Sequence, residues 1–144
     1  MIGVKESSGN LQQIGELLAN APETFTVFAG DDYLALPILA GGGKGLISVA
    51  SNVAPRQLSE LVHAALTQDM HSARGHARRL HPLMKVLFVE PNPAPTKAML
   101  AMMGLIEGDT LRLPMVPVND ATREELREVA SSVGLLSPKT NKAQ

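Results

Sequence analysis

Short apolar runs alternate with amphipathic stretches over the first half of the chain. The runs at residues 2–5, 25–29 and 45–49 are rich in apolar and β-branched residues, and glycine or polar residues bound each of them. Such runs are typical of strands that are buried on both faces. Apolar residues recur at helical spacing between them, and an alternation of strands and helices requires parallel strands with right-handed crossovers. The first half is therefore predicted to be α/β.

Local signals place the ends of these helices. Asn10 is a suitable N-cap for the first helix, Asp32 is expected to cap a second helix, and Pro55 is a good first position for a third. The glycine-rich run at residues 41–45 lacks the P-loop spacing and precedes a strand, whereas phosphate binding needs glycines that open a helix. This run therefore predicts the end of a helix that enters a strand.

The second half is predicted to be helical. Residues 73–87 carry apolar positions at steps of three and four, which predicts an amphipathic helix that Pro82 should kink. The prolines at 91–95 indicate a rigid turn before another helix, whose methionines at 99–103 are expected to fill a core and not to contact a cofactor. A last helix should end at Gly134.

Composition and charge limit the classes of ligand. The chain has 144 residues with 44% hydrophobic and 19% charged residues, which is typical of a globular protein. Its 13 Lys and Arg nearly cancel its 14 Asp and Glu, so no strong field would attract nucleic acid or an acidic membrane. The absence of cysteine excludes disulfides and thiolate metal sites. No apolar run approaches the ~20 residues that span a bilayer, so we expect a cytoplasmic protein with a small ligand.

The four histidines do not have the spacing of a metal site. They occur at positions 63, 71, 76 and 81, and these gaps do not produce the i, i+4 alignment that places two ligands on one helical face. With the arginines at 74, 78 and 79, His71 is expected to form a solvated basic face. We therefore expect no bound metal.

Lys5 is the candidate for chemistry. A lysine is ordinarily a surface residue, and that interpretation stays open on position alone. Lys5 nevertheless closes an apolar strand and precedes the polar, glycine-containing loop of residues 6–10, as at the carboxyl face of a βα unit, where barrel enzymes place their active sites. Burial there would favour the free amine that imine formation requires.

Five segments in register resemble the dihydrodipicolinate synthase family. They read Ile-Gly-Val-Lys-Glu-Ser-Ser-Gly-Asn from residue 2, Phe-Ala-Gly-Asp-Asp from 28, Gly-Leu-Ile-Ser-Val from 45, Leu-Phe-Val-Glu-Pro-Asn-Pro from 87 and Leu-Arg-Leu-Pro from 111. Each segment alone is weakly specific, but their common order and spacing extend the resemblance from residue 2 to about residue 136. The last two segments favour this family over the sialic-acid lyases and keto-sugar-acid aldolases.

The resemblance implies a fold and its divisions. Residues 1–67 would form strands six to eight of a (β/α)8 TIM barrel with their helices, residues 68–136 a C-terminal helical extension, and residues 137–144 a flexible tail. A full barrel takes ~250 residues, so the resemblance implies that the first five strands are missing from this chain. The family's proton-relaying tyrosine and threonines would be missing with them, and Tyr33 does not match that tyrosine.

The resemblance also implies an activity. Lys5 would form an imine with pyruvate, whose enamine would add to aspartate semialdehyde to give 4-hydroxy-tetrahydrodipicolinate in lysine and diaminopimelate biosynthesis, without a cofactor. Ile47, mainly through its backbone, and Gly30 would contact the pyruvate moiety. The partners implied are a homo-oligomer, which is a tetramer in the family, or the N-terminal part of the barrel.

Two other functions stay open. The chain could belong to another pyruvate-dependent class I aldolase of the same superfamily, or it could be a truncated, non-catalytic unit that acts only in interaction or folding.

Overall fold

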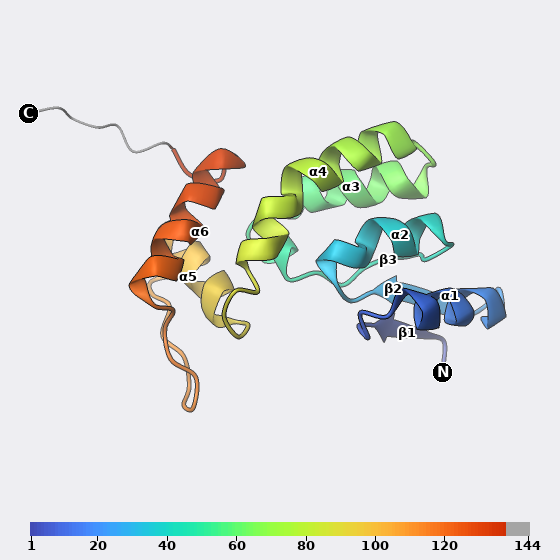
Figure 1. Ribbon diagram of the computed structural model, residues 1–144, viewed down its shortest axis with the longest axis horizontal. Helices are drawn as coiled ribbons and strands as arrows, with labels where there is room; N and C mark the ends of the chain where they lie inside the picture. Colours follow the sequence, from blue (N-terminus) through green and yellow to red (C-terminus); the bar gives the residue numbers. More distant parts are fainter. Residues whose placement is uncertain (138–144) are drawn as a thin grey trace, which may run out of the picture. The chain divides into compact units, whose positions relative to one another are not determined.

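The computed structural model describes residues 1–137 and contains two compact units, Met1–His81 and Pro82–Gln144 (Figure 1). Helix α4, Met70–Val86, belongs to both units because the boundary falls within it. Compactness does not define which residues form a barrel, so the division at residue 67 stays a prediction. Most of the tail expected at residues 137–144 lies outside the described residues. Within residues 1–137, no helix is both long and apolar enough to cross a membrane.

The first unit contains a parallel sheet of three strands in the order β1-β2-β3. Strand β1 is Gly3–Glu6, β2 is Thr26–Ala29 and β3 is Gly45–Leu46. Both pairs are parallel, which confirms the α/β prediction and the adjacency of the strands. The prediction that the third strand extends to residue 49 is wrong. The chain turns after Leu46 into a 3-10 helix, η2, at Ala50–Asn52, so residues 47–49 leave the sheet.

The two faces of this sheet differ in burial. Val27 and Ala29 of β2 are almost completely buried, whereas Phe28, between them, is only half-buried and its neighbour Lys5 is exposed. Successive side chains of a strand point to opposite faces, so one face is covered and the other is largely open. Helix α2, Ala35–Ala40, packs against β2 and against α3, Pro55–Leu66, on the covered side.

Two helix ends have the expected chemistry. Asn10 caps α1, Leu11–Asn20, because its side-chain oxygen accepts hydrogen bonds from the backbone amides of Gln12 and Gln13. After α2, Gly42 has a φ of 109°, and the amide of Gly43 donates to the Ile38 carbonyl at 2.8 Å. The glycine run therefore ends a helix and leads into β3, as predicted.

The expected capping role of Asp32 is wrong. The cap of the first turn after β2 is Asp31, whose carboxylate accepts from the amide of Tyr33 at 2.8 Å and begins the 3-10 helix η1, Asp32–Leu34. Asp32 is buried, and its carboxylate accepts from amides that follow β3. The misassignment arose because adjacent aspartates give the same local signal, and only a long-range contact distinguishes them.

The described residues after Leu46 contain helices and no strand, in agreement with the prediction for the second half. Helix α4 continues through Pro82, α5 is Ala94–Met102, and α6 is Asp120–Ser132. Pro95 was expected in the turn, but it lies in the first turn of α5, where its missing N–H is harmless. Gly134 has a φ of 76° at the end of α6, as predicted, and Met99 is fully buried.

Candidate active site at the carboxyl ends of the strands

The register of the sheet brings the three predicted site residues to one edge. Lys5 is paired with Phe28, and Phe28 with Gly45. One step further, the amide of Gly30 donates to the Glu6 carbonyl at 2.7 Å, and the amide of Ile47 donates to the Ala29 carbonyl at 2.8 Å. The carboxyl ends of the strands therefore place Lys5, Gly30 and Ile47 in neighbouring positions, although 25 and 17 residues separate them along the chain.

Gly30 lies directly against the candidate lysine. A Cβ atom at Gly30 would be 2.8 Å from Cε of Lys5, 2.8 Å from the backbone oxygen of Glu6 and 1.9 Å from Oγ of Ser7. These distances are too short for any side chain, so glycine is needed for the close approach of the two strand ends. Ser7 was not among the predicted site residues. Its only local signal was its place in the polar loop after Lys5.

The site is open to solvent on the side of Lys5 and Ile47. Lys5 is exposed, and Ile47 keeps 46% of its surface accessible. Burial of the lysine was one reason to expect the free amine, and the described residues do not provide it. That burial would have to come from further chain that covers the open face of the sheet.

Two buried carboxylates lie close to these positions in sequence and were not predicted. Glu6 keeps 6% of its surface accessible, and its Oε1 accepts from the amide of Ser8 at 2.9 Å. Asp32 keeps 2% of its surface accessible, and its Oδ2 accepts from the amides of Val49 and Ala50 at 3.0 and 2.9 Å. Within residues 1–137, the second oxygen of each carboxylate is buried without a hydrogen-bond partner. A buried polar atom of this kind is uncommon and calls for an explanation.

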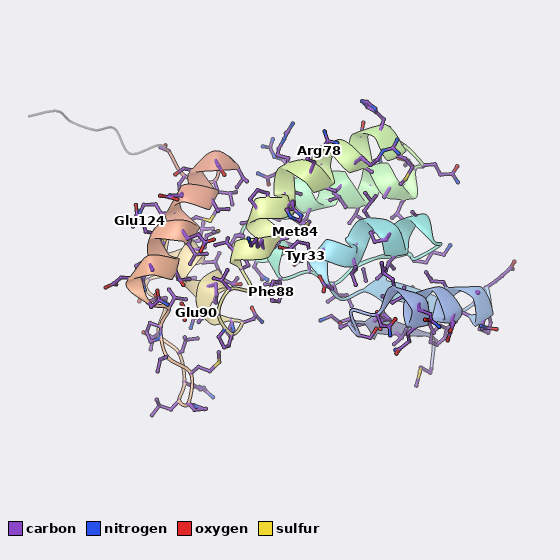
Figure 2. All side chains as sticks on the ribbon, in the orientation of Figure 1. Tyr33, Arg78, Met84, Phe88, Glu90 and Glu124 are labelled. Carbon is purple, nitrogen blue, oxygen red and sulfur yellow. The ribbon has the colours of Figure 1, made fainter. Side chains whose placement is uncertain are left out.

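Tyr33 has its own environment beside the loop after β2. Its ring contacts the ring of His81 in an edge-to-face arrangement with centroids 5.1 Å apart, and its position is labelled in Figure 2. Partial burial, together with the negative charge of Asp31, raises the pKa of the Tyr33 hydroxyl above its ordinary value. Tyr33 therefore packs against the ring of His81 on α4.

The histidines do not converge on a common point. His71 and the three nearby arginines are exposed on α4, as the basic-face interpretation predicted, and Arg78 projects from that helix in Figure 2. His76 instead lies 3.8 Å from the carboxylate of Glu60 on α3. Among residues 1–137, no group of three or more histidine, aspartate or glutamate side chains is arranged to hold a metal ion.

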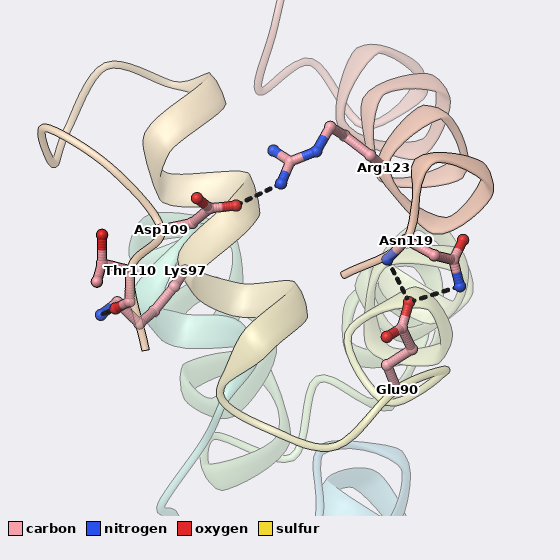
Figure 3. A network of polar contacts seen from close by, with 6 residues as sticks. All are labelled: Glu90, Lys97, Asp109, Thr110, Asn119 and Arg123. Atoms are coloured by element: carbon pink, nitrogen blue, oxygen red, sulfur yellow. Dashed lines mark hydrogen bonds and ion pairs between the residues drawn. The ribbon is translucent and has the colours of Figure 1, made fainter. Parts of the chain in front are cut away.

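In the second unit, the two proline-containing segments at residues 90–93 and 111–114 contribute to packing around α5 and α6. Oε1 of Glu90 accepts from the backbone amide and the side-chain amide of Asn119 at 3.1 and 3.0 Å, and Asn119 caps α6 (Figure 3). Pro91 and Pro114 line the same small cavity of 210 Å³. Glu90 thus connects the turn before α5 to the start of α6.

Asp109 and Lys97 secure the loop between α5 and α6. Arg123 of α6 donates to the Asp109 carboxylate at 2.5 Å, and Lys97 of α5 donates to the Thr110 carbonyl (Figure 3). The Arg123 guanidinium holds the pKa of Asp109 below its ordinary value, mainly through this hydrogen bond. Asp109, Arg123 and Lys97 therefore have structural partners in this unit.

A parallel sheet with helices on one face, and with a lysine and close-packed backbone at its carboxyl edge, defines part of a TIM-barrel type α/β protein. A family model described as the Dihydrodipicolinate synthetase family matches residues 1–133, and the chain belongs to this family. The family resemblance found in the sequence is thereby confirmed.

Relatives of known name support the same assignment. The chain is 53% identical over 133 residues to a 4-hydroxy-tetrahydrodipicolinate synthase of Acidobacterium capsulatum, a match that covers 92% of this chain and 44% of the relative. It is 51% identical over 140 residues to the synthase of Koribacter versatilis, a match that covers 97% of this chain and 46% of that relative. The chain thus spans less than half the length of the curated relatives that it matches.

Solved structures share the fold. Dihydrodipicolinate synthase from Aquifex aeolicus superposes with a TM-score of 0.90 at 43% identity, covering 94% of this chain and 46% of that one. The chloride-inhibited enzyme from Acinetobacter baumannii, solved in complex with pyruvate, superposes with a TM-score of 0.90 at 32% identity and the same coverage. The strands and helices described above therefore match part of the dihydrodipicolinate synthase structure.

Proposed function

We propose that this chain supplies the C-terminal part of a 4-hydroxy-tetrahydrodipicolinate synthase. Strands β1, β2 and β3 would be the sixth, seventh and eighth strands of the (β/α)8 barrel, and the helices from α4 onward would form the extension that follows it. The activity belongs to the barrel that forms when the first half is present. We expect that protein in the cytoplasm.

Lys5 would carry the covalent chemistry. Its amine attacks the keto carbon of pyruvate, and loss of water gives an imine. The imine withdraws electrons from the neighbouring methyl carbon, so loss of a proton there gives an enamine, which attacks the aldehyde carbon of aspartate semialdehyde. Gly30 and the backbone of Ile47 would lie against the pyruvate moiety. No cofactor is needed because the imine is itself the electron sink.

The observation that supports this proposal most directly is the contact between Lys5 and Gly30. The lysine lies over a glycine that tolerates no side chain, and Ile47 follows on the next strand at the same edge. A lysine at a random surface position would not share the carboxyl edge of a parallel sheet with close-packed backbone. TIM-barrel enzymes place their catalytic groups at this edge.

The relatives make pyruvate the first ketoacid to test. The Acinetobacter baumannii structure holds pyruvate, and the matching relatives carry the name of the synthase. Another pyruvate-dependent aldolase activity would use the same lysine with a different aldehyde. A non-catalytic role would leave Lys5 without reactivity in any context. The completed protein is expected to be a homo-oligomer.

The proposal is tested by completing the barrel. The 144-residue chain is fused behind the N-terminal half of the Acidobacterium capsulatum relative, incubated with pyruvate and reduced with borohydride. Intact mass and a peptide map should show a single adduct on Lys5. Addition of aspartate semialdehyde should give turnover, whereas turnover only with another aldehyde would favour the related aldolases.

Matched lysine variants provide the controls. Lys5→Arg should abolish labelling and turnover, because a guanidinium stays protonated at working pH. Lys44, Lys85 and Lys97 should stay unlabelled, and Lys44→Arg should label like the unsubstituted protein. An adduct on one of these three lysines, or a folded fusion without any adduct, would refute the proposed function.

A further inference from the structure

The segment after β3 is held by a side chain from the loop after β2. The chain leaves the sheet at Leu46, and the amide of Ile47 makes the last hydrogen bond to β2, with the Ala29 carbonyl at 2.8 Å. Two residues later, the amides of Val49 and Ala50 both donate to Oδ2 of Asp32. Residues 47–50 are therefore fixed at both ends by groups 17 to 18 residues earlier in the chain.

The burial of Asp32 makes these contacts costly to replace. The residue keeps 2% of its surface accessible, so its carboxylate accepts these hydrogen bonds largely shielded from water. Hydrogen bonds from backbone amides to a buried charged acceptor are among the stronger ones in proteins. The other oxygen, Oδ1, has no partner within residues 1–137. Local structure does not explain this arrangement, because the neighbouring Asp31 already caps η1.

We propose that Asp32 is a positioning residue that holds residues 47–50 so that the Ile47 backbone faces the site of Lys5. The role rests on the proposed function, in which that backbone lies against pyruvate. Asp32 does not contact the reacting atoms in this arrangement. It acts through the two amides that fix the direction in which the chain leaves β3, and without them Ile47 would keep only its bond to Ala29.

The hydrogen bonds themselves can be tested on the 144-residue chain without any activity. Amide hydrogen exchange of Val49 and Ala50 should be slow in the unsubstituted chain, and Asp32→Ala should accelerate it at least about tenfold. Asp31→Ala removes a carboxylate that bonds only within its own turn, so it should leave both amides protected. Unprotected amides in the unsubstituted chain would overturn the proposal, as would equal exchange in the Asp32→Ala chain.

The positioning role is tested in the completed barrel by the pyruvate dependence of labelling at Lys5. Asp32→Ala should raise the half-saturating pyruvate concentration about tenfold, while the extent of labelling at saturating pyruvate changes by less than about twofold. Asp32→Asn keeps one acceptor oxygen and alters only the oxygen that has no partner. Its half-saturating pyruvate concentration should therefore lie within about threefold of the value for the unsubstituted protein. A purely structural defect would lower the labelled fraction at all concentrations.

One further variant guards against a failure to fold. If Asp32→Ala does not fold, Asp32→Glu keeps the charge and the acceptor but lengthens the side chain, so it should bind the amides and still raise the half-saturating concentration about fivefold. The same pyruvate dependence in the Glu and unsubstituted proteins would then overturn the positioning role. If the unsubstituted fusion does not label at all, the proposed function fails, and the positioning role fails with it. Hydrogen exchange of the Val49 and Ala50 amides still decides whether Asp32 holds residues 47–50.

Discussion

At the scale of single residues, the contact of Gly30 with Lys5 and Ser7 shows how closely two strand ends approach. The nearest backbone atom, the carbonyl oxygen of Glu6, accepts the Gly30 amide and belongs to the same contact. Backbone at this point cannot move without breaking the sheet. The space above Gly30 is occupied by the side chains of Ser7 and Lys5 and by the Glu6 carbonyl, so a side chain added there should affect stability and labelling together.

We expect Gly30→Ala to destabilise the first unit by about 1–3 kcal/mol, because the new methyl group would overlap Ser7 and the Glu6 carbonyl. In the completed barrel it should also reduce borohydride trapping at Lys5. Denaturant unfolding measures the first effect and peptide mass the second. Gly15→Ala is the matched control, since nothing lies within 4 Å of a Cβ there and an alanine in α1 should stabilise by about 0.5–1 kcal/mol. Equal stability of both variants would contradict this explanation.

The pair of Asp109 and Arg123 predicts a pH dependence. The pKa of Asp109 is lowered in the folded state, so the pair stabilises the protein above the unfolded value of about 3.9 and loses that contribution as the pH falls through the folded value. Asp109→Asn should therefore reduce stability at pH 7 by up to about 1 kcal/mol, since both side chains are partly accessible.

Urea unfolding at neutral and acid pH measures this difference. It should shrink as the pH falls below about 4, where the unfolded chain begins to bind a proton at Asp109, and should vanish below the lowered pKa of the folded carboxylate. Glu107→Gln, which alters an exposed carboxylate of the same loop, should show a smaller effect at pH 7. A loss of stability in Asp109→Asn that stays constant down to acid pH would show that packing, and not charge, dominates.

At the scale of elements, the second unit depends on the connection between the turn before α5 and the start of α6. Asn119 combines two functions there, because it caps α6 through the Thr122 amide at 2.9 Å and also donates to Glu90. An ordinary cap has only the first function. Glu90 of the Glu-Pro-Asn-Pro segment thus contributes to the packing of the helices.

We expect Asn119→Ala to lower the free energy of unfolding by about 1–2 kcal/mol, because it removes the cap and leaves Glu90 with only the backbone donor. The matched control is Asn10→Ala at the start of α1, where the exposed side chain only caps the helix and the further bond, from the Asn10 backbone amide to Oγ of Ser8, survives the substitution. Its cost should be nearer to about 0.5 kcal/mol. Denaturant midpoints of the two variants provide the comparison, and an equal cost would show that the Glu90 contact contributes nothing.

At the scale of the whole molecule, the sheet of the first unit has two outer edges. The outer sides of β1 and β3 have no strand partner within residues 1–137, and Ile2 beside β1 is 87% exposed. The face that carries Lys5 and Phe28 is only partly covered. In a closed barrel, each of these surfaces is paired or packed. They are therefore the surfaces where the other half of a barrel would bind.

We accordingly expect residues 1–144 alone to be catalytically silent and to associate with other copies. Unpaired apolar strand edges tend to pair with another chain, and Lys5 would lack the groups that exclude water and transfer protons. Light scattering and a condensation assay with pyruvate and aspartate semialdehyde test both points. The fusion with the N-terminal half should be more uniform in size and active. A monodisperse monomer of the isolated chain with appreciable turnover would show that the first half is not required.

The sequence by itself determined the features that depend on neighbouring residues. Apolar periodicity predicted the parallel strands and the helices, the side chain of Asn10 predicted a cap, and Gly134 predicted a helix end. These signals are local, because a cap or a left-handed glycine acts within one turn of the chain. The position of Lys5 at a strand end was predictable for the same reason.

Only the tertiary structure decided which groups from separate strands meet. It placed Ser7 and Lys5 against Gly30, ended β3 at Leu46, and assigned Asp32 to the amides of Val49 and Ala50 in place of its own helix. Local propensity cannot distinguish Asp31 from Asp32, since either carboxylate can cap the turn that follows. The register of the parallel strands decides between the two aspartates, because it brings the end of β3 beside the loop after β2. The amides of Val49 and Ala50 then find their acceptor in the buried carboxylate of Asp32.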